Sequence, residues 1–176
     1  MHLKRLRSDE RGVAAVEFAL IAPIMILLYC GLAELSIAMM AERRAAHTAS
    51  VVADLVAQSG SVTTTDLADI YKIGNAIMYP FPATTLKMRV TAVTADASAI
   101  PKVAWSQANG MTPFAKNATV TGFPVNLMVA GDSVIQADVQ YTFSSPLKYV
   151  LPNDINFNDT YYLKPRQGGA VSCTTC

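Results

Sequence analysis

Residues 11–34 read RGVAAVEFALIAPIMILLYCGLAE and decide the class of this 176-residue chain. Residues 18–33 carry no charge, and Glu17 and Glu34 are the only charged residues between positions 13 and 40. A helix needs about 20 mostly apolar residues to cross a bilayer, so we predict one transmembrane helix over residues 13–40. The apolar share of the whole chain, 52%, is high for an ordinary soluble domain and agrees with a membrane segment.

The segment before this helix is basic. Residues 1–12, MHLKRLRSDERG, contain four Lys or Arg residues against one Asp and one Glu. Because basic flanks stay in the cytoplasm, we expect residues 1–12 to form a cytoplasmic leader and the C-terminal part to lie outside. The alternative is a secretory signal peptide removed near residues 38–46. The apolar stretch is longer than a typical signal core, and helix-forming sequence continues through that region without a breaker, which favours a retained helix.

Two glutamates lie within the apolar stretch. Counted from Val13, the residue after Gly12, Glu17 is the fifth residue and Phe18 the sixth. An ionised carboxylate in a membrane helix costs a few kcal/mol, so Glu17 requires a partner unless it lies hydrated at the headgroup level. We interpret Glu34, close to the outer end of the span, as a hydrated residue rather than a subunit contact.

This layout resembles that of type IV prepilins, and residues 11–34 closely resemble the TadE-like family of minor pseudopilins of the Tad (Flp) pilus systems. The family pattern falls on Gly12, Ala15, Val16, Glu17, Phe18, Ala19, Leu20, Pro23, Leu27, Leu28, Gly31 and Glu34. The resemblance implies that a prepilin peptidase cuts between Gly12 and Val13, and that Glu17 and Phe18 serve assembly. The new Val13 amine, with an ordinary pKa of about 7.7–8.0, would then be a charged partner for Glu17.

The resemblance also implies where the chain works and with what. We expect a single-pass protein of the bacterial inner membrane with a periplasmic C-terminal domain, either at the base of the pilus or within its fibre. The implied partners are the lipid bilayer, the prepilin peptidase, other pilins or pseudopilins, and inner-membrane pilus-assembly proteins. The alternative is a signal-anchored envelope protein whose exterior domain is an adhesin or a ligand-binding module.

The helix is expected to continue beyond the membrane as an exterior spine over residues 41–60. Residues 41–58 contain neither Pro nor Gly, and Ser59 and Gly60 supply the stop. His47 is expected to face solvent. The spacing i, i+4, i+7 and i+11 of an amphipathic helix is met by Ala45, Ala49, Val52 and Val56.

Residues 61–176 are expected to form an exterior α+β domain, pilin-like by resemblance, with antiparallel strands and a helix on one face. A helix should begin at Thr65-Asp66 and end before Pro80. Strands are expected over residues 86–93, 102–106 and 161–164, with Trp105 in the core. A hairpin should join residues 127–129 and 133–143, and residues 107–126 should form a long surface loop.

The composition and motifs also bear on chemistry. A net charge of +1 provides no electrostatic field that would attract nucleic acid, so we expect no nucleic-acid partner. No phosphate-binding, dinucleotide or zinc motif occurs, so we expect no catalytic residue, cofactor or metal. We therefore predict a structural protein and not an enzyme. Cys173 and Cys176 would lie in an oxidising compartment and are candidates for a local or cross-subunit disulfide. Cys30 is interpreted as a packing residue.

Overall fold

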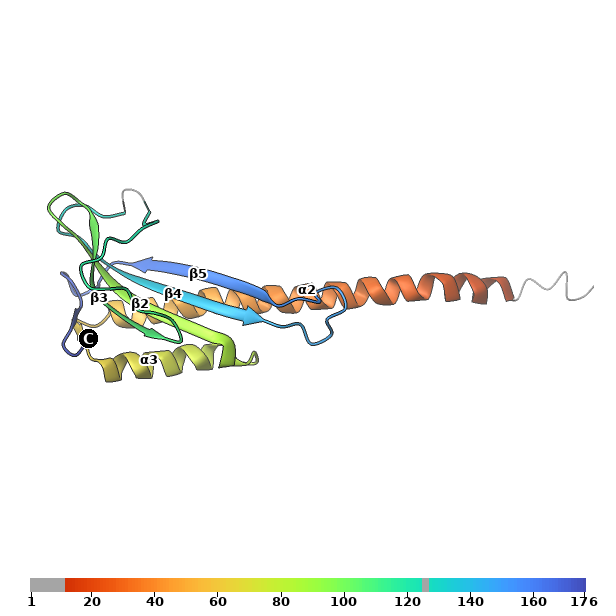
Figure 1. The fold of residues 1–176 in the computed structure, drawn as a ribbon. Coiled ribbons are helices and arrows are strands. Elements are labelled where there is room, and N and C mark those ends of the chain that lie inside the picture. Colours follow the sequence, from red (N-terminus) through yellow and green to blue (C-terminus); the bar gives the residue numbers. More distant parts are fainter. Residues whose placement is uncertain (1–11, 125–126) are drawn as a thin grey trace, which may run out of the picture. The chain divides into compact units, whose positions relative to one another are not determined.

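The computed structural model describes residues 12–124 and 127–176 (Figure 1). The chain forms two compact units, one comprising the residues up to Ala38 with Ser144–Asn153, the other Met39–Phe143 with Asp154–Cys176. Helix α2, Val13–Ala57, contributes to both. The predicted leader lies outside the described residues, apart from Gly12. A long N-terminal helix followed by a small domain with an antiparallel sheet confirms the α+β prediction.

The first unit pairs the N-terminal half of α2 with a segment that has no helix or strand. We call this segment, Ser144–Asn153, the strap. Pro23 lies inside α2, and the helix continues through it. Proline is tolerated inside apolar helices of this type because neighbouring groups can satisfy the freed carbonyl.

In the second unit, the C-terminal half of α2 buries the predicted apolar stripe. Each of its four residues is at most 1% exposed, which confirms the amphipathic prediction, and His47 is exposed as expected. Helix α3, Thr64–Ile77, begins one residue earlier than expected because Thr63 caps it: the Asp66 amide donates to Thr63 Oγ1 (3.2 Å) and the Thr63 amide to Asp66 Oδ2 (2.8 Å). A short 3₁₀ turn, η2 (Ala83–Thr85), leads into the sheet.

Gly74 of α3 marks the point where both helices meet the sheet. A Cβ at this position would lie 2.6 Å from Met88 Sδ and 3.2 Å from Thr48 Cγ2, so only glycine fits without displacement. The guanidinium of Arg44 on α2 also donates to the carbonyl oxygen of Ile77 at the end of α3 (3.0 Å). The close approach of α3, α2 and β2 therefore depends on the missing side chain.

The sheet is antiparallel with strand order β3-β2-β4-β5 (Figure 1). Its strands are β2 (Leu86–Ala95), β3 (Pro101–Asn109), β4 (Ser133–Phe143) and β5 (Ile155–Leu163). Opposed apolar pairs such as Met88 with Val139 and Val90 with Ala137 line one face. The expected core aromatic, Trp105, is 8% exposed and donates from Nε1 to the carbonyl of Val171 (2.8 Å).

Several strand predictions were wrong in extent or partner. Residues 127–129 form no strand: β4 pairs with β2 and β5 instead, so the expected hairpin is absent. Strand β5 begins at Ile155, six residues before the prediction, because Asn156, Asn158 and Asp159 are residue types disfavoured in strands. A parallel pair, β1 (Ser61–Val62) with β6 (Ser172–Cys173), is too short to show any alternation.

The predicted surface loop after β3 is partly a core element. Val120 is buried with Val93 and Val103, and four partly buried residues pack against them. These four are Phe114, Ala118, Phe123 and Met128. This cluster explains why β2 is buried on both faces near its end, where the sequence pattern indicated a half-buried strand.

A polar network occupies the sheet face opposite the Met88 pair. Asp138 Oδ2 accepts from Arg89 Nε (2.9 Å), while Asp138 Oδ1 accepts from Gln136 Nε2 (2.9 Å) and Thr160 Oγ1 (2.8 Å). The Arg89 guanidinium also lies 3.6 Å from the centroid of the Phe114 ring. The network therefore connects β2, β4, β5 and the loop after β3 through one carboxylate.

Candidate functional site

The four residues expected to serve processing and assembly lie together at the start of α2. Gly12 is exposed, Val13 is the first residue of the α-helix and is 52% exposed, and Phe18 is 72% exposed. Glu17 is exposed as well, and within the part of the chain that the structure describes it forms no ion pair. These residues are thus accessible to another molecule.

The same half of α2 exposes an almost continuous apolar surface. None of its most apolar 18-residue window is buried, and α2 is the one helix among the described residues that is long and apolar enough to cross a membrane. Large side chains on this surface are about half exposed or more: Val16, Leu20, Ile21, Ile24, Met25, Ile26, Leu27, Leu28, Tyr29, Leu32 and Leu35. Cys30 is half-buried and has a free thiol. A helix of this kind suggests a single-pass membrane anchor.

Glu34 is where the structure overturns the sequence interpretation most clearly. The side chain was expected to be hydrated, yet it is 0% exposed. Its carboxylate accepts three backbone amides of the strap: Tyr149 donates to Oε1 (2.8 Å), and Val150 and Leu151 donate to Oε2 (both 2.9 Å). Charge-assisted bonds to three consecutive amides replace the water that the carboxylate would otherwise bind.

Gly31 lies one turn before Glu34 on the same face of α2. A Cβ at Gly31 would lie 2.9 Å from Val150 Cγ2, so a larger residue would displace the Val150 side chain. The strap residue Ser145 is also buried, at 3% exposure. Gly31 and Glu34 together form a docking surface for the strap, a role that the sequence analysis missed. The sequence analysis assigned the Glu34 carboxylate to water, because nothing in the local sequence points to donors 115 or more residues away.

The comparisons with known proteins bear on this half of α2. Residues 12–54 match the family model described as TadE-like protein.

The chain carries a TadE-like domain.

No curated protein and no solved structure matched the chain. The TadE-like match confirms the resemblance seen in the sequence and begins at Gly12, so it includes Glu17, Gly31 and Glu34. The TadE-like family is a pilus-associated structural family, and the domain suggests a protein related to the Tad pilus with a membrane anchor. The strap and the sheet lie outside the TadE-like match.

Beyond the TadE-like match, the structure joins Cys173 and Cys176 by a disulfide. Cys173 is in β6, which pairs with β1 directly after the TadE-like helix ends. The bond closes a loop of only four residues, so it restricts the unfolded chain little. The oxidation state in cells stays a prediction.

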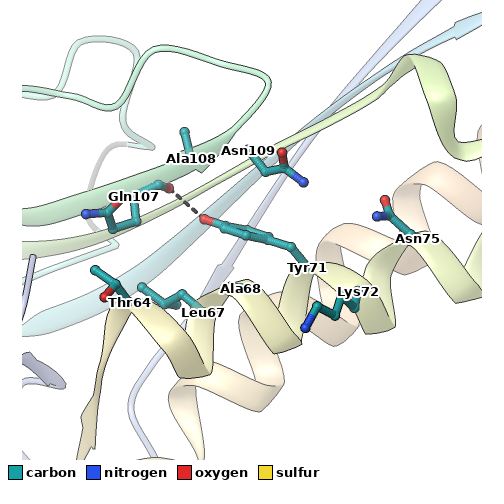
Figure 2. Close-up of a pocket in the computed structure, with 9 residues that line it drawn as sticks. All are labelled: Thr64, Leu67, Ala68, Tyr71, Lys72, Asn75, Gln107, Ala108 and Asn109. Carbon is teal, nitrogen blue, oxygen red and sulfur yellow. Dashed lines mark hydrogen bonds between the residues drawn. The ribbon is translucent and has the colours of Figure 1, made fainter.

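A groove of about 340 Å³ runs between α3 and the edge strand β3 (Figure 2). Tyr71 lies across it and donates its hydroxyl to the carbonyl of Gln107 (2.7 Å), as Figure 2 shows. Burial raises the pKa of Tyr71, so the phenol stays protonated and keeps donating. The lining residues include no carboxylate, histidine or cysteine, and Lys72 pairs with Asp69 outside the groove (2.8 Å). Such a groove offers no general acid or base paired with a nucleophile.

Proposed function

We propose that this chain is a membrane-anchored minor pseudopilin that takes part in assembly of a Tad/Flp pilus or a related secretion machine. A prepilin peptidase cuts between Gly12 and Val13, and α2 then packs against helices of other pilins or pseudopilins and of inner-membrane assembly proteins. The observation that carries the proposal is the exposed Gly12, Val13, Glu17 and Phe18 group at the start of an apolar TadE-like helix.

The exposure of these residues supports processing and helix packing. Among residues 12–124 and 127–176, no side chain or distant backbone atom lies within 4 Å of the place where a Gly12 Cβ would lie, so none of them covers the bond to be cut. A free Val13 amine, largely charged at neutral pH, would then offset part of the cost of the Glu17 charge in lipid. The pairing can form within one chain or between neighbours.

The proposed location follows from the basic leader and the single apolar helix. The N-terminus lies in the cytoplasm, α2 crosses the inner membrane, and the sheet domain lies in the periplasm. Alkaline phosphatase fused after Cys176 should be active in otherwise normal cells, because the enzyme requires an oxidising compartment. An inactive but full-length fusion would contradict this orientation.

Intact mass of the membrane-extracted protein tests processing. In cells with an active prepilin peptidase, the wild-type chain should begin at Val13, whereas Gly12→Leu should accumulate the longer form. Ala19→Leu, the matched control, adds the same side chain to the apolar helix and should still be cut. A wild-type chain that retains residues 1–12 would refute cleavage and leave only a membrane anchor.

The role of Glu17 separates the pseudopilin from an anchored adhesin. Glu17→Ala should be cut normally but should fail to support pilus assembly or secretion, because the α-amine loses its partner. Glu42→Ala, which removes an exposed carboxylate from the same helix after the proposed span, is the control and should assemble. Normal assembly with Glu17→Gln and with Glu17→Ala would favour a simple anchored binding protein.

A further inference from the structure

We propose that the strap is a membrane-surface element that inserts Leu147 and Tyr149 at the boundary between headgroups and acyl chains beside α2. The occupant of this apolar surface is the lipid bilayer itself. The inference goes beyond the pseudopilin role and rests on the proposed membrane span of α2. It also assigns a task to Gly31 and Glu34, which the processing and assembly mechanism does not use.

The contact between the strap and Glu34 allows irregular backbone to lie at the membrane boundary, because it satisfies backbone amides of the strap. Near hydrocarbon, an unpaired backbone N–H costs several kcal/mol, which restricts non-helical chain to places where its polar groups are satisfied. The amides of Tyr149, Val150 and Leu151 all donate to the Glu34 carboxylate at 2.8–2.9 Å. The same three bonds compensate the buried negative charge, so each partner satisfies the other.

The close contact at Gly31 holds the strap against the helix. Val150 approaches so closely that a Cβ on Gly31 would lie 2.9 Å from Val150 Cγ2. Glycine therefore leaves room for the Val150 side chain against the helix. Val150 keeps 48% exposure beside this contact, and Leu147 and Tyr149 remain accessible at 51% and 75% exposure.

The depth of the docking surface matches the edge of the bilayer. Glu34 follows Val13 by 21 residues, which at about 1.5 Å per residue places it about 31 Å along the helix. A typical hydrocarbon core is about 30 Å thick. If α2 enters the core near Val13, the strap is held where acyl chains give way to headgroups.

The exposed side chains of the strap suit that boundary. Tyr149 is 75% exposed and Leu147 is 51% exposed, and they flank Lys148, which is exposed as well. Tyrosine is enriched at membrane interfaces, and a lysine there can extend its ammonium to the phosphates. Residues 144–153 contain no acidic side chain that would oppose this contact. The exposed apolar side chains of the strap belong to the same compact unit as those of the N-terminal half of α2.

Brominated-lipid quenching of tryptophan tests the inference in the full chain, reconstituted at one chain per lipid nanodisc so that no second copy is present. The wild-type chain has a single tryptophan, the buried Trp105, which supplies the baseline. Three variants are compared: Tyr149→Trp in the strap, Ile26→Trp in the proposed span, and Tyr79→Trp after α3. Tyr79 is the matched control because its exposure, 78%, is close to the 75% of Tyr149.

We expect brominated lipid to quench the tryptophans at positions 149 and 26, and soluble acrylamide to quench the one at position 79. Quenching at position 26 with only acrylamide quenching at position 149 would overturn the inference and leave the span intact. Absence of lipid quenching at position 26 would overturn the proposed span itself. Equal lipid quenching at positions 79 and 149 would also overturn the inference, because the contact would not be specific to the strap.

The docking surface is tested in the Tyr149→Trp chain. Glu34→Ala removes the acceptor and Gly31→Leu displaces Val150, so both should lose the lipid quenching at position 149 and gain acrylamide quenching. Glu42→Ala should leave it unchanged. Emission from Trp105 checks that the sheet domain remains folded. Full lipid quenching in both docking variants would refute the role assigned to Gly31 and Glu34.

Discussion

Asp138 should be among the most sensitive polar positions in the sheet domain. The Asp138 side chain is 9% exposed and its partner Arg89 is 16% exposed, with 2.9 Å between Arg89 Nη2 and Asp138 Oδ2. Asp138→Ala leaves the guanidinium buried without its counter-charge and removes the acceptor for Gln136 and Thr160. Removing one partner of a buried ion pair costs about 3–5 kcal/mol. The remaining bond from Arg89 to the carbonyl of Thr112 (3.0 Å) does not neutralise the charge.

Urea unfolding of the full chain in detergent, followed by Trp105 fluorescence, measures this loss. Asp69→Ala is the matched control because the Asp69–Lys72 pair is exposed (63% and 77%), and such pairs contribute about 0.5 kcal/mol or less. We expect the free energy of unfolding to fall several times further for Asp138→Ala than for Asp69→Ala.

A double variant isolates the charge effect. Arg89→Met combined with Asp138→Leu removes both charges and should be less destabilising than Asp138→Ala alone, because no uncompensated ion remains. A loss for Asp138→Ala no larger than that of the Asp69→Ala control would show that the network is hydrated and would refute the reasoning.

Three further predictions concern other parts of the sheet domain. Hydrogen bonds from the side chain and backbone of the helix N-cap lower the pKa of Asp66 below its ordinary 3.8, so its stabilisation is present above that value and is lost as pH falls through the lowered pKa. The difference in melting temperature between wild type and Asp66→Asn should accordingly shrink in acid, and a difference independent of pH would count against the ionised cap. Gly74→Ala should destabilise the domain by about 1–3 kcal/mol in the same urea assay, because the new methyl group overlaps Met88 Sδ; an unchanged midpoint would show that Met88 yields. Cys173 and Cys176 should resist alkylation in cells until a reductant is added, and two freely labelled thiols in native protein would disprove the disulfide in vivo.

The helices were the most predictable part of the fold because their signals are local. A charge-free run long enough to span a membrane and a stripe at helical spacing need only neighbouring residues, and α2 follows both. The start of α3 was placed within a residue or two from Thr65-Asp66, because residue types that favour a helix start are a local signal, although the cap itself is Thr63. The strands were less predictable, since the first half of β5 is rich in Asn and Asp, which are disfavoured in strands, and its length is set by pairing with β4.

The sequence alone determined the TadE-like helix and the α+β class. Apolar length, helical periodicity and strand alternation are all properties of contiguous residues, so they can be seen without the fold. Only the tertiary structure decided what Glu34 and Asp138 do. Each carboxylate takes partners distant in the chain, the strap 115 residues or more after Glu34 and Arg89 49 residues before Asp138. A buried carboxylate requires hydrogen-bond donors, and the local sequence does not indicate which distant residues will supply them. The burial of Glu34, and with it the position of the strap, follows from that distant pairing.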